Sequence, residues 1–245
     1  MPTIAPRREL FAWAMYDFAN SGYTTVVLTT IFNAYFVGVV VGRAAGFPEG
    51  VGTLLWTLAV SIPNALVLVS APMLGAIADH YAAKKRFLLI TTIGCVLGTA
   101  LLALTGPGDV WWAMTLVVLS NLTFATGENL IAAFLPEISD RGTMGRVSAY
   151  GWAVGYLGGL TLLGVCLAYV SWAQRHGFDA PQYVPVTMLI VAGMFALAAT
   201  PTFLWLKERA VSVQRSPGEH SLTIGFQRLR HTLADRARFR DLFRF

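Results

Sequence analysis

The sequence predicts an all-α membrane protein with six transmembrane helices. Three observations lead to this prediction. Of the 245 residues, 56% are hydrophobic and only 13% are charged, the apolar residues gather in six long runs, and basic residues cluster between alternate runs. A soluble domain of this size cannot bury so much apolar surface, and about a quarter of its residues would be charged. The composition excludes a disordered chain and a secreted disulfide-rich scaffold, and it argues against an ordinary cytosolic enzyme.

Each apolar run is long enough to cross a bilayer, which takes about 20 residues of helix. We expect helices rather than strands, because an isolated strand leaves its backbone polar groups unsatisfied in lipid. Helix breakers such as Gly46, Pro107 and Pro181 lie between the runs. The predicted spans cover residues 13–41, 54–78, 87–104, 110–135, 147–170 and 184–206.

The first of these spans differs from a cleaved signal peptide. Asp17 interrupts its apolar run, and no small-x-small cleavage site follows. We therefore expect this span to remain in the mature protein.

Basic residues predict the orientation of the spans. If the N-terminus is cytoplasmic, all but Arg43 and Arg175 of the 18 Lys and Arg residues fall on the cytoplasmic side. This asymmetry is the one that the positive-inside rule describes. We expect an even number of spans, both termini in the cytoplasm and an integral protein of the bacterial cytoplasmic (inner) membrane.

The segment 207–245 is expected to be separate from the bundle of residues 1–206. Apolar residues recur in it at spacings of three and four, and basic residues lie mostly off that stripe. The pattern predicts a basic amphipathic helix on the cytoplasmic membrane face. A disordered basic tail is the alternative. The apolar stripe consists of Leu222, Phe226, Leu229, Leu233 and Ala237.

Polar residues inside the first span are candidate functional groups. Asp17, Asn20, Ser21 and Thr24 fall on one helical face, and Tyr23 lies in the same stretch. Charges at membrane depth are costly and usually functional. We expect this face, with Asp17, Asn20 and Tyr23, to line a substrate or proton pathway. The alternative is that Asp17 sits near the interface and caps a helix or pairs with a basic group.

Glu128 is a carboxylate deep in the fourth span. Asn121 and Ala125 lie on the same helical face. Because the neighbouring residues are small, the carboxylate can approach another helix or a cavity and carry a proton there. The alternative is a Glu that hydrogen-bonds a neighbour and only locks the packing.

The fifth span carries a stripe of glycines. A glycine face lets two helix backbones approach closely, so we expect this stripe to pack against another helix. The stripe consists of Gly151, Gly155, Gly158 and Gly159.

The connector between the second and third spans is a candidate conformational latch. Gly75 and Asp79 lie one turn apart on one face, where the glycine would allow close helix contact. Lys84, Lys85 and Arg86 follow. A carboxylate there can meet a helix N-terminus or a cation in one state and lose it in another. An ordinary positive-inside loop is the alternative.

These motifs carry a family resemblance. The stretch 75–86 resembles the major facilitator signature G-x-x-x-D-x-x-x-x-[KR]-[KR]-[KR], and 151–159 is similar to the antiporter motif of that superfamily, with Tyr156 at the usual proline. The opening 13–23, WAMYDFANSGY, together with 135–137, LPE, resembles the vacuole-effluxer-like (unknown major facilitator) family. One departure is Ile-Ala at 131–132.

The resemblance implies the N-terminal six-helix bundle of a major facilitator fold. It implies a secondary active transporter, either a permease or an effluxer, for a small solute such as an amino acid or related metabolite. Transport would be proton-coupled, as symport or antiport, and would use alternating access. That superfamily has twelve spans in two halves, so we expect a missing C-terminal half. A half-size transporter acting as a homodimer and a non-transporting membrane scaffold are the alternatives.

Other function classes leave no trace in the sequence. It contains no H-E-x-x-H, no P-loop and no nucleophile elbow, so we expect neither an enzyme nor a primary pump. Cys95 and Cys166 lack metal-ligand spacing, and we expect no metal and no cofactor. The expected partners are a small-molecule solute and membrane lipid. Nucleic acid is not expected, because the basic residues punctuate apolar runs and form no basic face.

Overall fold

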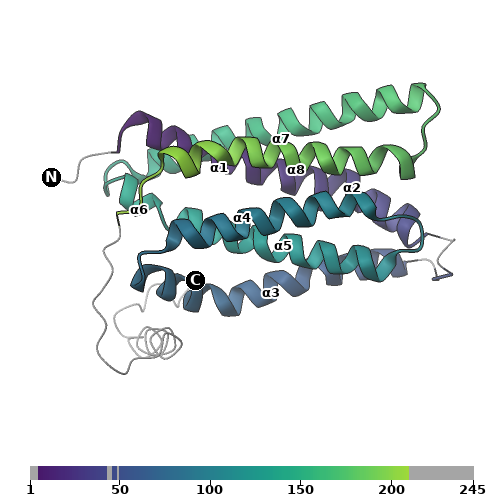
Figure 1. The fold of residues 1–245 in the computed structure, drawn as a ribbon, viewed down its shortest axis with the longest axis horizontal. Helices are drawn as coiled ribbons and strands as arrows, with labels where there is room; N and C mark the ends of the chain where they lie inside the picture. The colour runs from purple at the N-terminus through teal and green to yellow at the C-terminus, as the bar shows by residue number, and fades with distance from the viewer. Residues whose placement is uncertain (1–4, 43–45, 49, 210–245) are drawn as a thin grey trace.

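The structure is a computed structural model and describes residues 5–42, 46–48 and 50–209. Within these ranges the chain is helical and contains no strand. Long helices run back and forth, and the N-terminal ends of α1, α4 and α7 lie at one end of the bundle (Figure 1). The elements are α1 (Arg7–Tyr23), η1 (Thr24–Thr30), α2 (Ile31–Tyr35), η2 (Phe36–Val40), α3 (Val51–His80), α4 (Lys84–Leu101), η4 (Leu102–Leu104), α5 (Val110–Ala132), α6 (Leu135–Ile138), α7 (Met144–Arg175) and α8 (Ala180–Trp205).

Six helices in the described residues are long and apolar enough to cross a membrane, which confirms the predicted fold class. The first span extends from Arg7 to Val40 and so begins earlier than residue 13. In its charged first turn, Glu9 is buried and pairs with Arg209. Asp17 lies ten residues after the first residue of α1, at Arg7, which is about 15 Å along the helix axis.

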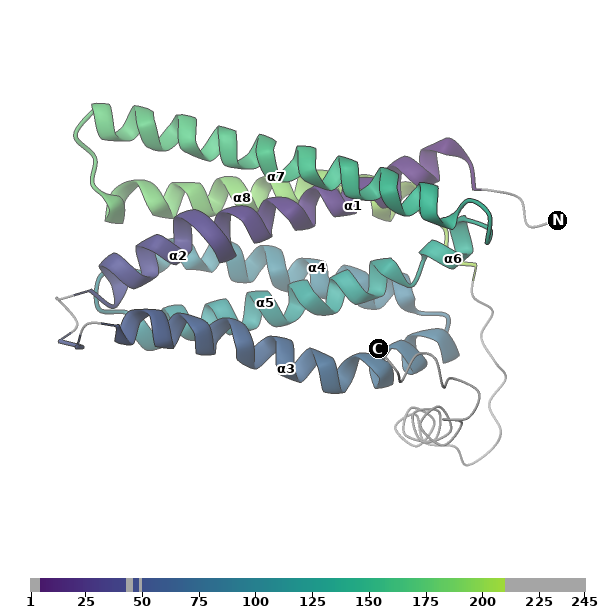
Figure 2. The ribbon, with the colours of Figure 1, turned by 180° about the vertical axis from the view of Figure 1, so that it is seen from behind.

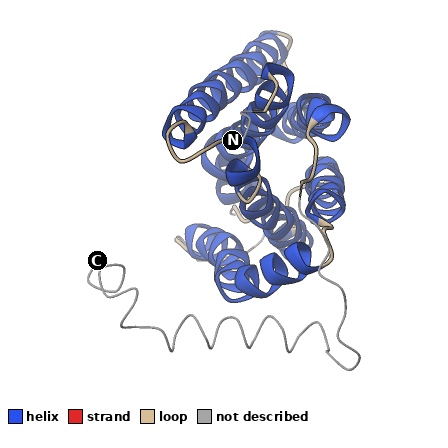
Figure 3. Cartoon of the chain, turned by 90° about the vertical axis from the view of Figure 1, so that its left-hand side faces the viewer, coloured by secondary structure: helices blue, strands red, loops and turns tan. Residues whose placement is uncertain are grey.

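The helices pack in two groups that share α8. The most extensive contacts of α1 are with α7 and α8, whereas α5 packs against α3 and α4 (Figure 2). The contact between α4 and α8 joins the two groups. Figure 3 shows the described helices viewed along the bundle. Large apolar side chains such as Phe32, Phe36 and Met188 are fully buried in the core.

The first span is not a regular α-helix throughout. Two stretches, η1 and η2, are wound as π-helix. In η1, the hydroxyls of Thr29 and Thr30 donate to the carbonyl of Thr25, at 2.8 and 2.6 Å. Side chains that bond back to the backbone in this way compete with regular helical hydrogen bonds. π-Helical turns are rare in proteins overall, but a large share of those that occur lie at functional sites.

The predicted amphipathic helix of the tail lies outside the described residues, except for 207–209.

Candidate functional site

A cavity of about 420 Å³ lies between α1, α5 and α7. Its volume is within the range of small-molecule sites, about 300–1,000 Å³. The lining residues come from three spans that are distant in sequence. They are Asp17, Asn20, Ser21, Thr24, Thr25, Glu128, Trp152, Gly155, Tyr156, Gly159 and Leu160.

The α1 wall is the polar face expected from the sequence. Asp17, Ser21 and Thr24 are partly buried there. Asn20 is only 3% exposed, and neither its Oδ1 nor its Nδ2 has a hydrogen-bond partner among the described residues. Thr24 begins the π-helical stretch η1, so the change in helix winding occurs at the cavity.

Glu128 faces the same cavity from α5. It lies about one helical turn before the end of α5 at Ala132, and it is exposed. Within the described part of the chain, neither Glu128 nor Asp17 makes a hydrogen bond or an ion pair. The cavity therefore brings together two carboxylates, neither with a counter-charge among the described residues, from positions more than a hundred residues apart in the sequence.

The glycine stripe of α7 lies directly on the polar face of α1. A Cβ atom at Gly155 would lie 2.8 Å from Ser21 Oγ, and one at Gly159 would lie 2.9 Å from Thr25 Oγ1. A Cβ at Gly158 would overlap the backbone carbonyl of Phe18.

Gly151 faces the same helix. A Cβ there would collide with the ring of Trp13 and would lie 3.0 Å from Asp17 Oδ2. The absence of side chains along this stripe allows α7 to form a cavity wall against α1.

Two aromatic residues at the cavity were not predicted as site residues. Trp152 and Tyr156 line it from α7, with ring centroids 5.1 Å apart in an edge-to-face arrangement. Both are well exposed, so the cavity opens on the outer surface of the bundle. The sequence did contain a signal for these two residues. They are four residues apart and each follows a glycine of the stripe, so both rings lie at the edge of the helix face that meets α1.

Tyr23 and Asn121 do not line this cavity. The Tyr23 hydroxyl shares a hydrogen bond of 2.9 Å with Ser120 Oγ, and its ring lies 4.8 Å from that of Phe124. Asn121 Nδ2 donates to the carbonyl of Val60 at 3.2 Å. In this structure both side chains are buried and join helices: α1 to α5 through Tyr23, and α5 to α3 through Asn121.

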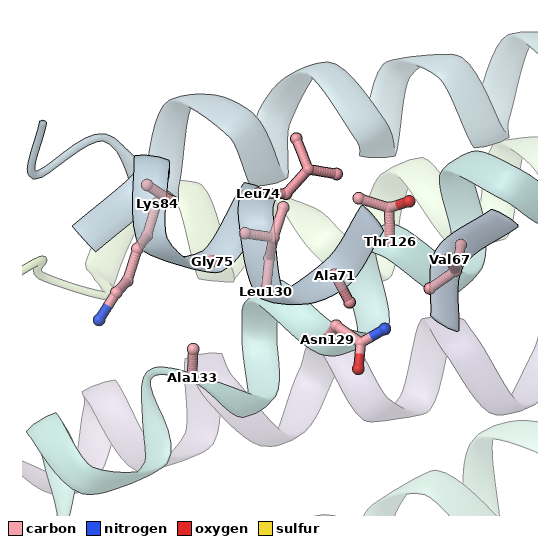
Figure 4. A pocket seen from close by; sticks show the side chains of 10 residues that line it. Val67, Ala71, Leu74, Gly75, Lys84, Thr126, Asn129, Leu130 and Ala133 are labelled. Atoms are coloured by element: carbon pink, nitrogen blue, oxygen red, sulfur yellow. The ribbon is translucent and has the colours of Figure 1, made fainter. Parts of the chain in front are cut away.

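A second, much smaller cavity lies between α3 and α5, with Lys84 of α4 at one end (Figure 4). Its volume is about 60 Å³, which is too small for a solute. Gly75 lines it, and a Cβ at Gly75 would meet no described atom within 4 Å. Gly75 therefore makes no close helix contact within the described residues, and its expected role in such a contact stays a prediction.

The basic residues after α3 take part in a charged network. Lys84 Nζ forms an ion pair of 2.8 Å with Glu137 Oε1 of α6. The Glu208 carboxylate accepts the backbone N–H groups of Lys84 and Lys85, at 2.7 and 3.2 Å, and so caps the first turn of α4. Lys85 Nζ donates to the carbonyl of Leu206 at 2.6 Å.

Arg86 is exposed. Asp79 lies in the last turn of α3, and its side chain is outside the described part of the structure.

Arg209 extends this network to α1. Its guanidinium pairs with Glu9 at 2.8 Å, and its backbone N–H donates to Glu137 at 2.7 Å. Sequence reasoning had not assigned Glu9 or Glu208 a role, and Glu137 had contributed only to the family resemblance. The available signal was that each of these acids lies next to the end of a span, where partners from other helices converge.

Among the described residues, no three His, Cys, Asp or Glu side chains gather as a metal site requires. Cys95 and Cys166 are buried free thiols.

Comparisons with known proteins agree with this architecture. Residues 53–245 match the family described as vacuole effluxer Atg22 like. The chain is also 27% identical, over 237 residues, to an uncharacterized MFS-type transporter, YxiO, of Bacillus subtilis (strain 168). That match covers 96% of this chain and 54% of the relative, so the chain spans about half the relative's length. No solved structure matches.

Both matches are named as an effluxer or a transporter, and not as enzymes. The motifs of the first span, of the connector after the second span and of the fifth span agree with the six-helix bundle and with the extent of the family match. The chain belongs to the vacuole effluxer Atg22-like family of major facilitator proteins.

Proposed function

We propose that this chain is one half of a secondary active transporter that moves a small solute, such as an amino acid or related metabolite, by alternating access. The observation that carries the proposal is the cavity between α1, α5 and α7, where Asp17 and Glu128 have no ion pair or hydrogen bond with any described residue. Charged groups within membrane spans are costly and are retained for substrate or ion pathways. The resemblance to a transporter family supports the same assignment.

The proposal includes coupling to the proton gradient. A carboxylate in a cavity that faces the two sides of a membrane in turn can bind a proton on one side and release it on the other. Glu128 and Asp17 are the groups proposed for this role. Tyr23 and Asn121 would support the pathway indirectly, because they fix the positions of α1 and α5.

A second half would close the open side of the cavity. Exposed Trp152 and Tyr156 at its edge support this arrangement. In the proposal, the second half is either a C-terminal six-helix bundle, reached through the linker 207–245, or a second copy of this chain. Both termini would lie in the cytoplasm, and the protein would reside in the bacterial cytoplasmic membrane.

The charged network around Lys84, Glu137 and Glu208 is the proposed conformational latch. It joins the ends of α4, α6 and α8 through ion pairs and backbone hydrogen bonds. Such contacts can form in one state of the transport cycle and break in another. Asp79 and Arg86 belong to the same proposed latch through the sequence motif.

The test is solute uptake into proteoliposomes under an imposed pH gradient. The purified chain is compared with a longer reading frame that continues past Phe245, using a mixture of radiolabelled amino acids and amines. Uptake by the longer protein alone supports the two-half arrangement, and uptake by the chain alone, with crosslinking to a dimer, supports the homodimer. Absence of gradient-driven uptake by both, with amino acids and amines supplied, would favour the non-transporting scaffold.

A further inference from the structure

The charge of the cavity lining has one sign only. Asp17 and Glu128 line it, and the lining contains no Lys, Arg or His. Within the described ranges neither carboxylate has an ion pair or hydrogen bond. Asp17 is partly buried, and Glu128 is exposed. Once a second half closes the open side of the cavity, both carboxylates would be removed from water, where they are strongly destabilised unless a counter-charge or hydrogen-bond donor reaches them. A cation or a proton would meet that need.

Asn20 is an independent sign of a ligand. It is a cavity-lining amide that is 97% buried, and neither polar atom of its side chain has a partner among the described residues. Buried amides are nearly always hydrogen-bonded, and an unpaired one calls for a ligand or water. Its Oδ1 is an acceptor beside the carboxylate wall, and a protonated amine carries up to three N–H donors that suit such an arrangement.

Two aromatic rings of the cavity lining can also attract a cation. Trp152 and Tyr156 line the cavity in an edge-to-face pair with centroids 5.1 Å apart. The face of an aromatic ring attracts a cation, most strongly for Trp. Carboxylates, an amide oxygen and aromatic faces together form a setting that favours a positively charged nitrogen and disfavours an anion.

We propose that this cavity binds a small organic amine in its protonated form, with the ammonium group between Asp17, Glu128 and Asn20 and the carbon skeleton toward Trp152 and Tyr156. The assignment rests on the proposed transport function and narrows its substrate class to solutes with a positive nitrogen and no net negative charge. A neutral solute would supply no counter-charge, so each carboxylate would have to take up a proton instead. An anionic solute would add like charge to them.

A series of three probes of similar shape tests the charge preference. The probes are 2-phenylethylamine, which is a cation at neutral pH, the neutral 2-phenylethanol and the anion 3-phenylpropanoate. Equilibrium dialysis measures their binding to the full chain in phosphatidylcholine nanodiscs, with empty nanodiscs as the partition blank. We expect the amine to bind at least about tenfold more tightly than the alcohol, because its hydrogen bonds are charge-assisted. We expect the anion not to bind measurably.

Variants locate the site. Asp17→Asn and Glu128→Gln keep the side-chain shapes and should each weaken amine binding about tenfold while leaving binding of the alcohol unchanged. Asp109→Asn removes one negative charge from an exposed residue outside the cavity and should change neither. Circular dichroism and gel filtration check that each variant is folded, and the probe series on the unmodified chain does not depend on any variant.

Equal affinity for amine and alcohol would overturn the proposal, and so would a lack of binding by all three probes. Amine binding that is unaffected by both Asp17→Asn and Glu128→Gln would also overturn it. Amine binding together with an absence of solute uptake in proteoliposomes would support the amine site and count against the transport function. The two failures are therefore distinguishable.

Discussion

Glu128 is the residue whose chemistry is most directly open to test. Glu128→Gln keeps the side-chain shape and much of its hydrogen-bonding capacity, but removes titration. In a transporter that contains both halves, we expect this change to abolish uptake driven by a pH gradient, because the Gln amide cannot bind and release a proton. Folding and membrane insertion should be retained. The measurement is radiolabelled uptake in proteoliposomes with and without the gradient.

The matched control for Glu128 is Asp109→Asn, which removes a charge from an exposed residue next to the start of α5. It should leave uptake intact. Unchanged gradient-driven uptake by Glu128→Gln would reject the proton role. Loss of folding in this variant would assign Glu128 to packing.

Asp140 provides a pH-dependent test outside the membrane spans. Hydrogen bonds from the Thr143 hydroxyl and backbone N–H, at 2.7 and 2.8 Å, lower the pKa of Asp140, and the Gly142 N–H adds to them. The resulting stabilisation is present above the ordinary carboxyl pKa of about 4 and is lost as the pH falls through the lower folded-state pKa.

Asp140→Asn keeps an acceptor oxygen but does not titrate. We expect the parent to be more thermally stable than this variant at neutral pH, and the difference to shrink as the pH falls below about 4. Thermal midpoints measured in detergent across this range test the expectation. A difference that stays constant with pH would contradict it.

At the scale of single elements, the α1–α7 contact depends on glycine. Gly158→Leu would force its side chain into the backbone of Phe18, which cannot move without displacing the helix. We expect a loss of about 1–3 kcal/mol of stability, as in overpacked cores, and a lower yield of folded protein in detergent. Gly155→Leu, which meets Ser21 Oγ, should act in the same direction.

Gly164 is the matched control for this stripe, since it lies on the same helix and a Cβ there would meet no described atom within 4 Å. Gly164→Leu should leave the thermal midpoint close to that of the parent. Equal stability of the Gly158 and Gly164 variants would mean that the stripe does not pack against α1.

A second element depends on a cap from a distant segment. Ala83 precedes α4 and has no side chain that could cap it, so the Glu208 carboxylate accepts the first N–H groups instead. Glu208→Ala should cost about 0.5–2 kcal/mol, as for other helix caps. Amide hydrogen exchange at residues 84–85 should then accelerate, while Lys207→Ala, at an exposed neighbour, should leave it unchanged. Unaltered exchange in the Glu208 variant would contradict the capping role.

At the scale of the whole molecule, the charge asymmetry predicts which ends face the cytoplasm. Phe47→Cys and Phe178→Cys should react with a membrane-impermeant maleimide applied to intact cells, whereas Ala83→Cys should react only after lysis. Cys95 and Cys166 are at most 1% exposed and give no background. Labelling of Ala83→Cys in intact cells would overturn this topology.

The sequence alone determined the number, order and approximate limits of the spans, because the length of an apolar run and the placement of charges are local properties that a bilayer imposes. It also identified Asp17 and Glu128, since a carboxylate in an apolar run stands out without any partner. The glycine stripe was equally visible, because its helical period lies within one element.

Only the tertiary structure decided what these residues face. It placed Asp17, Glu128 and Trp152 around one cavity, and it assigned Tyr23 and Asn121 to contacts between helices. It also brought Glu9, Glu137 and Glu208 to the basic residues around α4 and after α8. The physical reason is that helical periodicity specifies the faces of each helix, whereas the neighbour that each face meets depends on how all six helices pack together.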